Sequence, residues 1–394
     1  MMKVALFSPL NPVKSGISDY TEELLPEMAR DLELDLYINK GYQPSAPGIT
    51  ESFKVHPFEP ESFPSRDYDA IVYHMGNYYD AHGYIYESLK RFPGIVVLHD
   101  YVMQSFYAEQ YEEEGDFSCY RGLLEKYYGD QGRKIAERIQ ARRPVPIWES
   151  PEAVRFPLNE EILAHAKGVI VHSRFIYDRI RPMTESPIAV IPHHGHVLRR
   201  FETASIRRDL GIPEEDILIC SAGYVSKNKR FDLILEALSD LEGIPFHFVI
   251  AGEDRGRLFT PPPSGIRFDF QITGHLPLDK MEAIIAASDI CINLRYPTMG
   301  ESSGVQIRMM GYGKPVLVTN LGSYAEFPDY TVLKVDVDLD ETEVIKRFMH
   351  ALAADEDFRM SVGSEAGAFV ERECSIPRCA ELYTRFIKEC VGGD

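Results

Sequence analysis

Short apolar runs alternate with longer stretches of helical periodicity along the chain. In the first half, the compact apolar runs that indicate buried strands cover residues 4–7, 34–38, 70–73, 95–98, 169–171 and 188–191. A helical pattern covers residues 20–29 and follows the first of these runs. Strands separated by helices imply right-handed crossovers, so this half predicts a parallel, doubly wound α/β sheet.

The second half of the chain restarts the same alternation. Strands are expected at 217–220, 246–250, 290–294 and 316–319, and helices at 232–241, 278–287 and 305–312. Between the halves, residues 195–205 show neither helical nor strand periodicity. We therefore predict a Rossmann-like domain over residues 1–200, a second one over 201–375, and a closing helix over 376–394. Ligands of such sheets gather at the carboxyl ends of the strands.

Composition narrows the functional classes. The chain has 394 residues and a formal net charge of −19, from 42 basic and 61 acidic residues, which argues against a general nucleic-acid binder. The six cysteines are scattered, as expected for reduced thiols. Their spacing predicts no metal site. No apolar stretch approaches the roughly 18 residues of a membrane span. These features predict a cytoplasmic protein without a metal or cofactor.

The most informative stretch covers residues 289–328. A buried strand is followed by the turn Gly300-Glu301-Ser302-Ser303-Gly304 and then by an apolar helix that begins at Val305. Glycine before a helix lets backbone N–H groups approach an anion, and the helix N-terminus favours phosphate. Glu301 is better suited to accept hydrogen bonds from sugar or ribose hydroxyls. Phosphate donors beside a hydroxyl acceptor predict a nucleotide-sugar site.

This stretch also resembles a known family. Glu301-x-x-Gly304, the short helix, Gly313-Lys-Pro-Val316 and Gly322-Ser-x-x-Glu326 are similar to the donor site of family 4 glycosyltransferases. The resemblance implies the GT-B fold, in which two Rossmann-like domains face each other across a cleft and the terminal helix returns to the first domain. It also implies retention at the anomeric carbon. The family's second glutamate is absent, and the nearest position holds Arg308.

A second segment, residues 222–230, places basic side chains between a strand and a helix. In the resembled family an arginine follows the glycine and a lysine comes five residues later; here Tyr224 takes the first position, and Lys229 matches the second. Arg295 or Arg308 is a hypothetical substitute for the missing arginine. The resemblance implies the following donor-binding residues: Ser15, Gly16, Gly223, Lys229, Glu301, Ser302, Ser303, Gly304, Val305, Arg308 and Glu326.

Two sites in the first half complete the prediction. Ser15-Gly16 lies between the first strand and the first helix, where it would contact the donor diphosphate or the acceptor, although an ordinary strand-to-helix turn also fits. His99 follows a strand and is placed to bond a substrate hydroxyl, although it also fits a histidine packed at a domain edge. We assign catalytic roles to His99, Glu301 and Lys229.

The predicted function is sugar transfer from a GDP- or UDP-sugar to a glycan or lipid-linked acceptor, in cell-surface polysaccharide or glycoconjugate synthesis. Residues 121–143, which turn from aromatic to basic, are the hypothetical site of peripheral membrane contact. Alternatives are a catalytically silent nucleotide-sugar-binding subunit and a GT-B epimerase or phosphorylase. Two further interpretations fit the sequence less well. Asp336-Val337-Asp338 has the spacing of a metal-binding DxD motif but fits a solvated loop, and an oxidoreductase lacks its G-x-G-x-x-G fingerprint.

Overall fold

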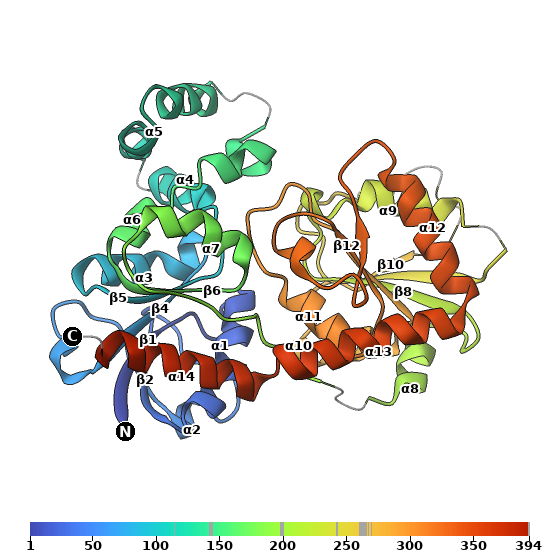
Figure 1. Ribbon diagram of the computed structural model, residues 1–394, viewed down its shortest axis with the longest axis horizontal. Coiled ribbons are helices and arrows are strands. Elements are labelled where there is room, and N and C mark those ends of the chain that lie inside the picture. Colours follow the sequence, from blue (N-terminus) through green and yellow to red (C-terminus); the bar gives the residue numbers. More distant parts are fainter. Residues whose placement is uncertain are drawn as a thin grey trace. The chain divides into compact units, whose positions relative to one another are not determined.

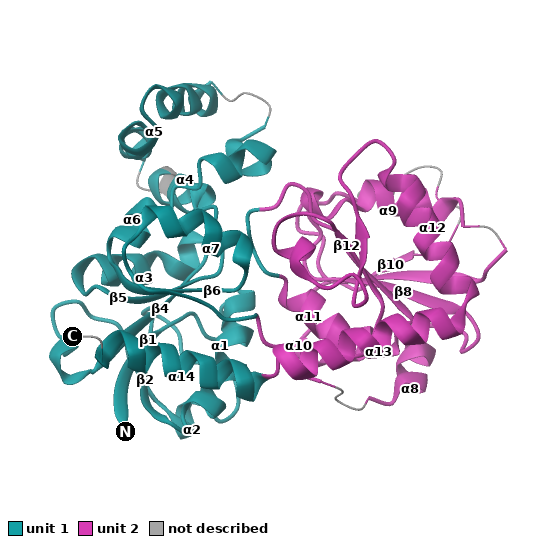
Figure 2. Ribbon diagram, viewed as in Figure 1, with its two compact units in different colours: residues 1–192, 299–302, 376–394 teal, residues 193–298, 303–375 magenta. Residues whose placement is uncertain are grey.

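The chain forms two α/β units. The computed structural model describes residues 1–113, 115–141, 145–197, 201–241, 243–259, 266, 268 and 270–392. Unit 1 contains Met1–Pro192, Met299–Ser302 and Ile376–Asp394, and unit 2 contains His193–Thr298 and Ser303–Ser375 (Figure 2). The chain thus leaves unit 1 after Pro192, whereas the sequence placed the boundary at residue 200, which lies outside the described residues.

Unit 1 is a parallel sheet with strand order β3-β2-β1-β4-β5-β6-β7 (Figure 1). Its strands are β1 (Met2–Phe7), β2 (Leu32–Ile38), β3 (Lys54–Pro57), β4 (Ala70–Met75), β5 (Gly94–Leu98), β6 (Ala166–Val171) and β7 (Ile188–Val190). In register, Val4 of β1 pairs with Leu34 of β2 and with Ala70 of β4. The order reverses direction at β1, so β1 and β4 flank the topological switch point of this sheet.

Helices connect these strands and cover both faces of the sheet. The helices of unit 1 are α1 (Gly16–Met28), α2 (Ile49–Ser52), α3 (Tyr79–Arg91), α4 (Gln104–Glu113), α5 (Phe117–Gln140), α6 (Glu160–Ala164), α7 (Arg174–Ile180) and α14 (Ile376–Gly392), with 3₁₀ turns η1 (Ser65–Asp67), η2 (Ile147–Glu149), η3 (Pro151–Arg155) and η4 (Arg181–Met183). Helix α5 is kinked at Gly129, whose φ is +55° and ψ is −132°.

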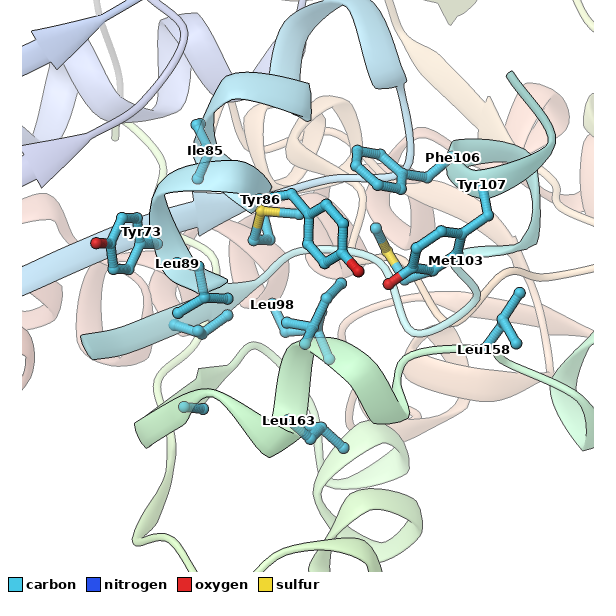
Figure 3. Packing of buried hydrophobic residues seen from close by; sticks show 14 of the residues in the cluster. Tyr73, Ile85, Tyr86, Leu89, Leu98, Met103, Phe106, Tyr107, Leu158 and Leu163 are labelled. Carbon is cyan, nitrogen blue, oxygen red and sulfur yellow. The ribbon is translucent and has the colours of Figure 1, made fainter. Parts of the chain in front are cut away.

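Alternate residues of the strands feed two hydrophobic clusters, because successive side chains of a strand point to opposite faces. On one face, Phe7 and Leu98 pack with Leu89 of α3 and Phe106 of α4. Figure 3 shows this cluster. On the other face, Leu6 and Val97 pack beneath α1 and α14. Helix α14, red in Figure 1, lies beside α1, and the hydroxyls of Tyr20 and Tyr383 are 2.7 Å apart.

Unit 2 repeats the architecture with strand order β10-β9-β8-β11-β12-β13. Its strands are β8 (Ile217–Ala222), β9 (Phe246–Ala251), β10 (Phe270–Ile272), β11 (Ile290–Asn293), β12 (Val316–Thr319) and β13 (Leu333–Val335). Its helices are α8 (Thr203–Asp209), α9 (Phe231–Ser239), α10 (Leu278–Ala287), α11 (Gly304–Gly311), α12 (Glu341–Ala354) and α13 (Glu356–Glu373), with η5 (Lys227–Lys229) and η6 (Gly322–Glu326). On one face of this sheet, Cys220 and Cys291 pack in the hydrophobic cluster beneath α10, α11 and α13. On the other face, Ile219 and Ile292 pack in the cluster beneath α9 and α12. Strands β8 and β11 flank the switch point of this sheet.

Candidate functional site

The glycine turn after β8 lies at the switch point of unit 2. Gly223 has a φ of +84°, a conformation that residues with a side chain rarely adopt, and its N–H donates to the carbonyl of Ala251 at 3.0 Å. A Cβ on Gly252 would lie 2.1 Å from the carbonyl oxygen of Gly223. A Cβ on Gly223 would lie 3.0 Å from Nζ of Lys229 and 3.7 Å from Cγ2 of Val305. The predicted residues Gly223, Lys229 and Val305 therefore meet in space.

Lys229 places a cation in the interior of this turn. Its side chain is 4% exposed, and Nζ donates to the carbonyl of Ala222 at 2.5 Å. Burial lowers the pKa of Lys229 well below its ordinary value, and the positive charge of Arg295 lowers it further. A bound anion would offset both the burial of the Lys229 amine and its repulsion by Arg295, so this arrangement favours an anionic ligand.

Arg295 approaches from the strand on the other side of the switch point. It follows β11, its N–H donates to Oγ1 of Thr319 at 2.9 Å, and its guanidinium donates to the carbonyl of Leu294 at 3.0 Å. Tyr224, which takes the arginine position of the resembled family, is exposed instead, and its hydroxyl accepts from Arg255 at 2.7 Å. Of the two hypothetical substitutes for that arginine, Arg295 is the one whose charge acts on Lys229.

The N-terminus of α11 lies beside the same turn. Oγ of Ser303 accepts from the N–H of Gln306 at 3.2 Å and thereby caps the helix. A Cβ on Gly304 would lie 2.9 Å from the ring of His193, so a larger residue would displace that ring. Val305 touches the Gly223 turn, as described above. The sequence prediction of a helix start at this turn is correct, because Gly304 begins α11.

Arg308 has an internal partner. It is 5% exposed, and its guanidinium donates to Oε1 of Glu282 on α10 at 2.5 Å, where the carboxylate side chain is fully buried. The sequence analysis did not foresee this ion pair, which holds α11 to α10. Glu326 ends η6 and is exposed. The roles of Arg308 and Glu326 toward a donor stay predictions.

In unit 1, the loop after β1 lies at the switch point of the first sheet. Oγ of Ser15 accepts from the N–H of Ile17 at 3.2 Å and caps α1, which begins at Gly16. A Cβ on Gly16 would meet nothing within 4 Å, so its surroundings are open. Gly76, which follows β4, would clash with Ile17 if it carried a Cβ, because that atom would lie 2.6 Å from Cδ1. The structure places Ser15 and Gly16 at the expected edge, and a contact with the donor stays a prediction.

His99 is the middle member of a chain of three buried imidazoles. Its Nε2 lies 3.1 Å from Nδ1 of His74, and its Nδ1 lies 3.2 Å from Nε2 of His172. Nδ1 of His172 lies 2.9 Å from the carbonyl oxygen of Ile191. A carbonyl can only accept, so Nδ1 of His172 carries the hydrogen. Burial lowers the pKa of His172 to about 4, which leaves Nε2 as an acceptor at neutral pH.

The position of the hydrogen on His172 fixes the donor and the acceptor of the other hydrogen bonds among the three histidines. Nδ1 of His99 donates to His172, and in neutral His99 the acceptor Nε2 receives the hydrogen of Nδ1 of His74. The ring of Tyr20 packs edge-on against His99 with a centroid distance of 4.9 Å. Both ring nitrogens of His99 thus have partners in unit 1, and a hydrogen bond from His99 to a substrate must replace one of them. Its catalytic role stays a prediction.

Glu301 and Ser302 belong to the segment Met299–Ser302 of unit 1. Oε2 of Glu301 accepts from the N–H of Met299 at 2.7 Å, and both Glu301 and Ser302 are partly buried. The predicted site residues therefore form two groups. Unit 1 holds Ser15, Gly16, His99, Glu301 and Ser302. Unit 2 holds Gly223, Lys229, Ser303, Gly304, Val305, Arg308 and Glu326.

Sequence reasoning missed the partners of His99, although a signal was present. His74, His99 and His172 each directly follow one of the apolar runs that predicted strands, at 70–73, 95–98 and 169–171. Strands β4, β5 and β6 are neighbours in the sheet, and parallel strands bring their carboxyl ends to one edge. A histidine repeated at this position in three successive runs would have predicted the cluster.

Several basic side chains of residues 121–143, the hypothetical membrane-contact region, form ion pairs. Arg121 pairs with Glu125 at 2.7 Å, Lys126 with Glu161 at 2.5 Å, Arg133 with Asp130 at 3.0 Å and Arg138 with Glu152 at 3.0 Å. Arg142 and Arg143 lie outside the described residues. Across the part of the chain that is described, no helix combines the length and apolar character needed to cross a bilayer.

In the DxD stretch, Asp336 accepts a hydrogen bond from the side-chain amide of Asn320 at 2.7 Å.

Part of the chain matches a protein-family model. Residues 202–364 match the family model of glycosyl transferases group 1. The match covers most of unit 2, including the glycine turn, Lys229 and α11. No curated protein sequence matched the chain.

Solved structures resemble the whole chain. Sucrose-phosphate synthase from Thermosynechococcus elongatus has a TM-score of 0.67 at 16% identity, with 100% of each chain covered. Anabaena HepE in complex with UDP-glucose has a TM-score of 0.66 at 13% identity, covering 99% of this chain and 100% of its own. WaaG, a glycosyltransferase involved in lipopolysaccharide biosynthesis, has a TM-score of 0.61 at 15% identity, covering 98% and 99%. The predicted α/β fold class, that of GT-B glycosyltransferases with two Rossmann-like units, is confirmed.

Proposed function

We propose that this protein is a retaining glycosyltransferase of family 4 type, which moves a sugar from a nucleotide-diphosphate donor to a hydroxyl of a glycan or lipid-linked acceptor. The observation that carries the proposal is the pair of cations at the switch point of unit 2. Lys229 is buried beside the Gly223 turn and within the field of Arg295, close to the capped N-terminus of α11. A diphosphate supplies the negative charge that this arrangement favours.

The proposed reaction needs charge stabilisation more than proton transfer by the protein. In front-face attack, the acceptor hydroxyl approaches on the side from which the diphosphate departs, and the leaving oxygen takes its proton. Lys229, Arg295 and the N–H groups at the start of α11 would stabilise the growing negative charge of the leaving diphosphate. Glu301 would orient the donor sugar through its hydroxyls. The scheme uses no metal ion.

The donor is proposed to be a UDP- or GDP-sugar, and the pathway to be cell-surface polysaccharide or glycoconjugate synthesis in the cytoplasm. Support for the donor class comes from HepE, which was solved with UDP-glucose. Peripheral membrane contact through residues 121–143 is a further part of the proposal. The four ion pairs of that region leave fewer basic groups to meet anionic lipids, so we expect such contact to be weak.

The test is a thermal-shift screen with UDP, GDP and ADP and their glucose conjugates on the wild type, Lys229→Ala and Lys227→Ala. A ligand at a hundred times its Kd stabilises the native state by about 2.7 kcal/mol. We expect one nucleotide family to raise Tm, Lys229→Ala to weaken the effect, and Lys227→Ala, which removes an exposed lysine of the same turn, to preserve it. No shift from any ligand would contradict the proposal.

One observation favours a second candidate, a catalytically silent nucleotide-sugar-binding subunit. The second glutamate of the resembled family is absent, and Arg308, at the nearest position with slightly shorter spacing, forms an ion pair with Glu282 inside unit 2. Analysis of the products by mass spectrometry and proton NMR after incubation with the binding donor separates these possibilities, because NMR distinguishes epimers of equal mass. Transfer or hydrolysis of the sugar supports the enzyme, an epimerised donor supports an epimerase, and binding without any product supports the silent subunit.

A further inference from the structure

The segment Met299–Ser302 is anchored on the residues that follow β5. The carbonyl of Met299 accepts from the N–H groups of Tyr101 at 3.1 Å and Val102 at 3.0 Å. Gly300 has a φ of +78°, and a Cβ there would lie 2.4 Å from Cβ of Tyr101. Only glycine therefore allows this approach. Asp100 precedes Tyr101 and Glu301 follows Gly300, so the backbone contacts hold these two acidic residues close together.

Each carboxylate already has a backbone donor. Oδ2 of Asp100 accepts from the N–H of Asn77 at 3.0 Å, and Oε2 of Glu301 accepts from the N–H of Met299 at 2.7 Å. A carboxylate can accept further hydrogen bonds, and a protonated carboxyl group can also donate one. Burial and then the negative charge of Glu301 raise the pKa of Asp100 to about 7, against a smaller opposing effect of the Asn77 N–H. Asp100 therefore keeps its proton below about pH 7, where an ordinary aspartate has lost it.

Other titratable groups around this pair come from three elements. His99 precedes Asp100, but its ring is bonded to His74 and His172 as described above. On α7, Arg179 lies 3.5 Å from the ring centroid of Phe175, and Glu160 begins α6; both act on the pKa of Tyr101. Glu301 is the one charged residue that contributes to the raised pKa of Asp100 among the described residues.

We propose that Asp100 and Glu301 form one hydroxyl-binding pair for the donor sugar, in which protonated Asp100 donates a hydrogen bond and ionised Glu301 accepts one. This inference rests on the proposed transferase function and extends it to a residue that the sequence analysis did not select. A hydroxyl group both donates and accepts, so an acid and a carboxylate side by side match its two roles. Loss of the Asp100 proton removes the donor and leaves two negative charges facing the sugar.

The first experiment follows the proton directly. Carbon-13 NMR of the side-chain carboxyl groups, recorded from pH 5 to pH 9 with Asp100→Asn for assignment, gives the titration midpoint of Asp100. We expect a midpoint near neutrality in the wild type and a lower midpoint in Glu301→Gln, because the variant removes the neighbouring charge. A wild-type midpoint in the ordinary range of aspartate, or one that Glu301→Gln leaves unchanged, would overturn the pair.

The second experiment measures binding by calorimetry at pH 6 and pH 8 for UDP, GDP, ADP and their glucose conjugates. Affinity of the wild type for the glucose conjugate should fall roughly tenfold at pH 8, since about a tenth of Asp100 keeps its proton one pH unit above its pKa. Asp100→Asn keeps a donor at every pH and should lack this fall. Equal pH dependence in both proteins would overturn this inference alone. Absence of binding by every nucleotide and conjugate would overturn the proposed function as well, whatever the NMR titration shows.

Discussion

The carboxyl edges of the two sheets share a topology and differ in chemistry. In each unit the strand order reverses beside a glycine-containing loop, at β1 and β4 in unit 1 and at β8 and β11 in unit 2. The edge of unit 1 carries imidazoles and carboxyl groups, whereas the edge of unit 2 carries Lys229 and Arg295. Ligands of such sheets gather at this edge, so we expect the residues directly after each strand to determine which chemical group each unit recognises.

Burial acts on both edges in the same direction, toward neutral groups. It lowers the pKa of Lys229 and of His172 and raises that of Asp100. A neutralised acid and neutral imidazoles suit uncharged hydroxyls, while a buried lysine beside a second basic group is favoured in its charged form when an anion binds. Three measurements test this contrast, beginning with the largest effect.

We expect the largest change in the free energy of unfolding at the buried ion pair of unit 2. Arg308→Met should lower the free energy of unfolding by roughly 3–5 kcal/mol, because Glu282 would be left buried without its cation. Urea denaturation at pH 7 measures it. The control is Arg347→Met, which breaks the exposed pair with Glu343 and should cost about 1 kcal/mol or less. Equal losses in the two variants would contradict a structural role for the Arg308–Glu282 pair.

In unit 1 the neutral histidines should make the protein acid-sensitive. Burial lowers the pKa of both His82 and His172 to about 4. Between that pH and the ordinary value of about 6.5, the unfolded chain binds more protons than the native state, so stability present at pH 7 is lost as the pH falls. The loss should approach about 3 kcal/mol per histidine by pH 4.

Denaturant unfolding at pH 7, 5.5 and 4.5 measures this loss. His82→Gln should flatten the dependence of stability on pH, whereas His350→Gln, which changes an exposed histidine of unit 2, should leave it as in the wild type. A wild-type stability that stays constant down to pH 4.5 would show that these imidazoles are not held neutral.

The smallest effect concerns the cost of the buried cation in unit 2. Lys229→Met should raise the free energy of unfolding at pH 7 by roughly 1–2 kcal/mol, since the native state no longer has to hold a charge that burial disfavours. The pKa of Lys229 is depressed, so its penalty disappears as the pH rises toward the unfolded value near 10.4, and the gain should shrink at pH 10. Lys227→Met is the matched exposed control, and chemical denaturation at both pH values measures the difference. A destabilised Lys229→Met protein would contradict the prediction.

Much of the fold is predictable because its central strands are apolar on both faces. Strands β1, β5, β8, β11 and β12 appear in the sequence as apolar runs, whereas the short strands β3 and β13, Lys54–Pro57 and Leu333–Val335, alternate with lysine or proline and escaped prediction. Edge strands bury less surface, so their sequences carry a weaker signal.

The candidate site was predictable to the extent that it is local in sequence. The start of α11 follows from a strand-turn-helix pattern within a few residues, and Gly223 and Lys229 follow from the resemblance of their short segment to the family motif. The ion pair of Arg308 with Glu282 and the approach of Asp100 to Glu301 join different elements of the fold. Such contacts depend on the crossovers between strands, which hydrophobic periodicity does not specify.

The position of α14 has a consequence for synthesis on the ribosome. Unit 2 is nearly continuous from His193 to Ser375, and its two ends are joined where the N–H of Gly195 donates to the carbonyl of Cys374 at 2.9 Å. Unit 1, in contrast, needs Tyr383 and Ile387 of α14 to complete the core beneath α1. Synthesis of unit 1 thus begins before that of unit 2 and is completed after it. The apolar face of unit 1 beneath α14 stays uncovered until α14 has been made, which follows all of unit 2.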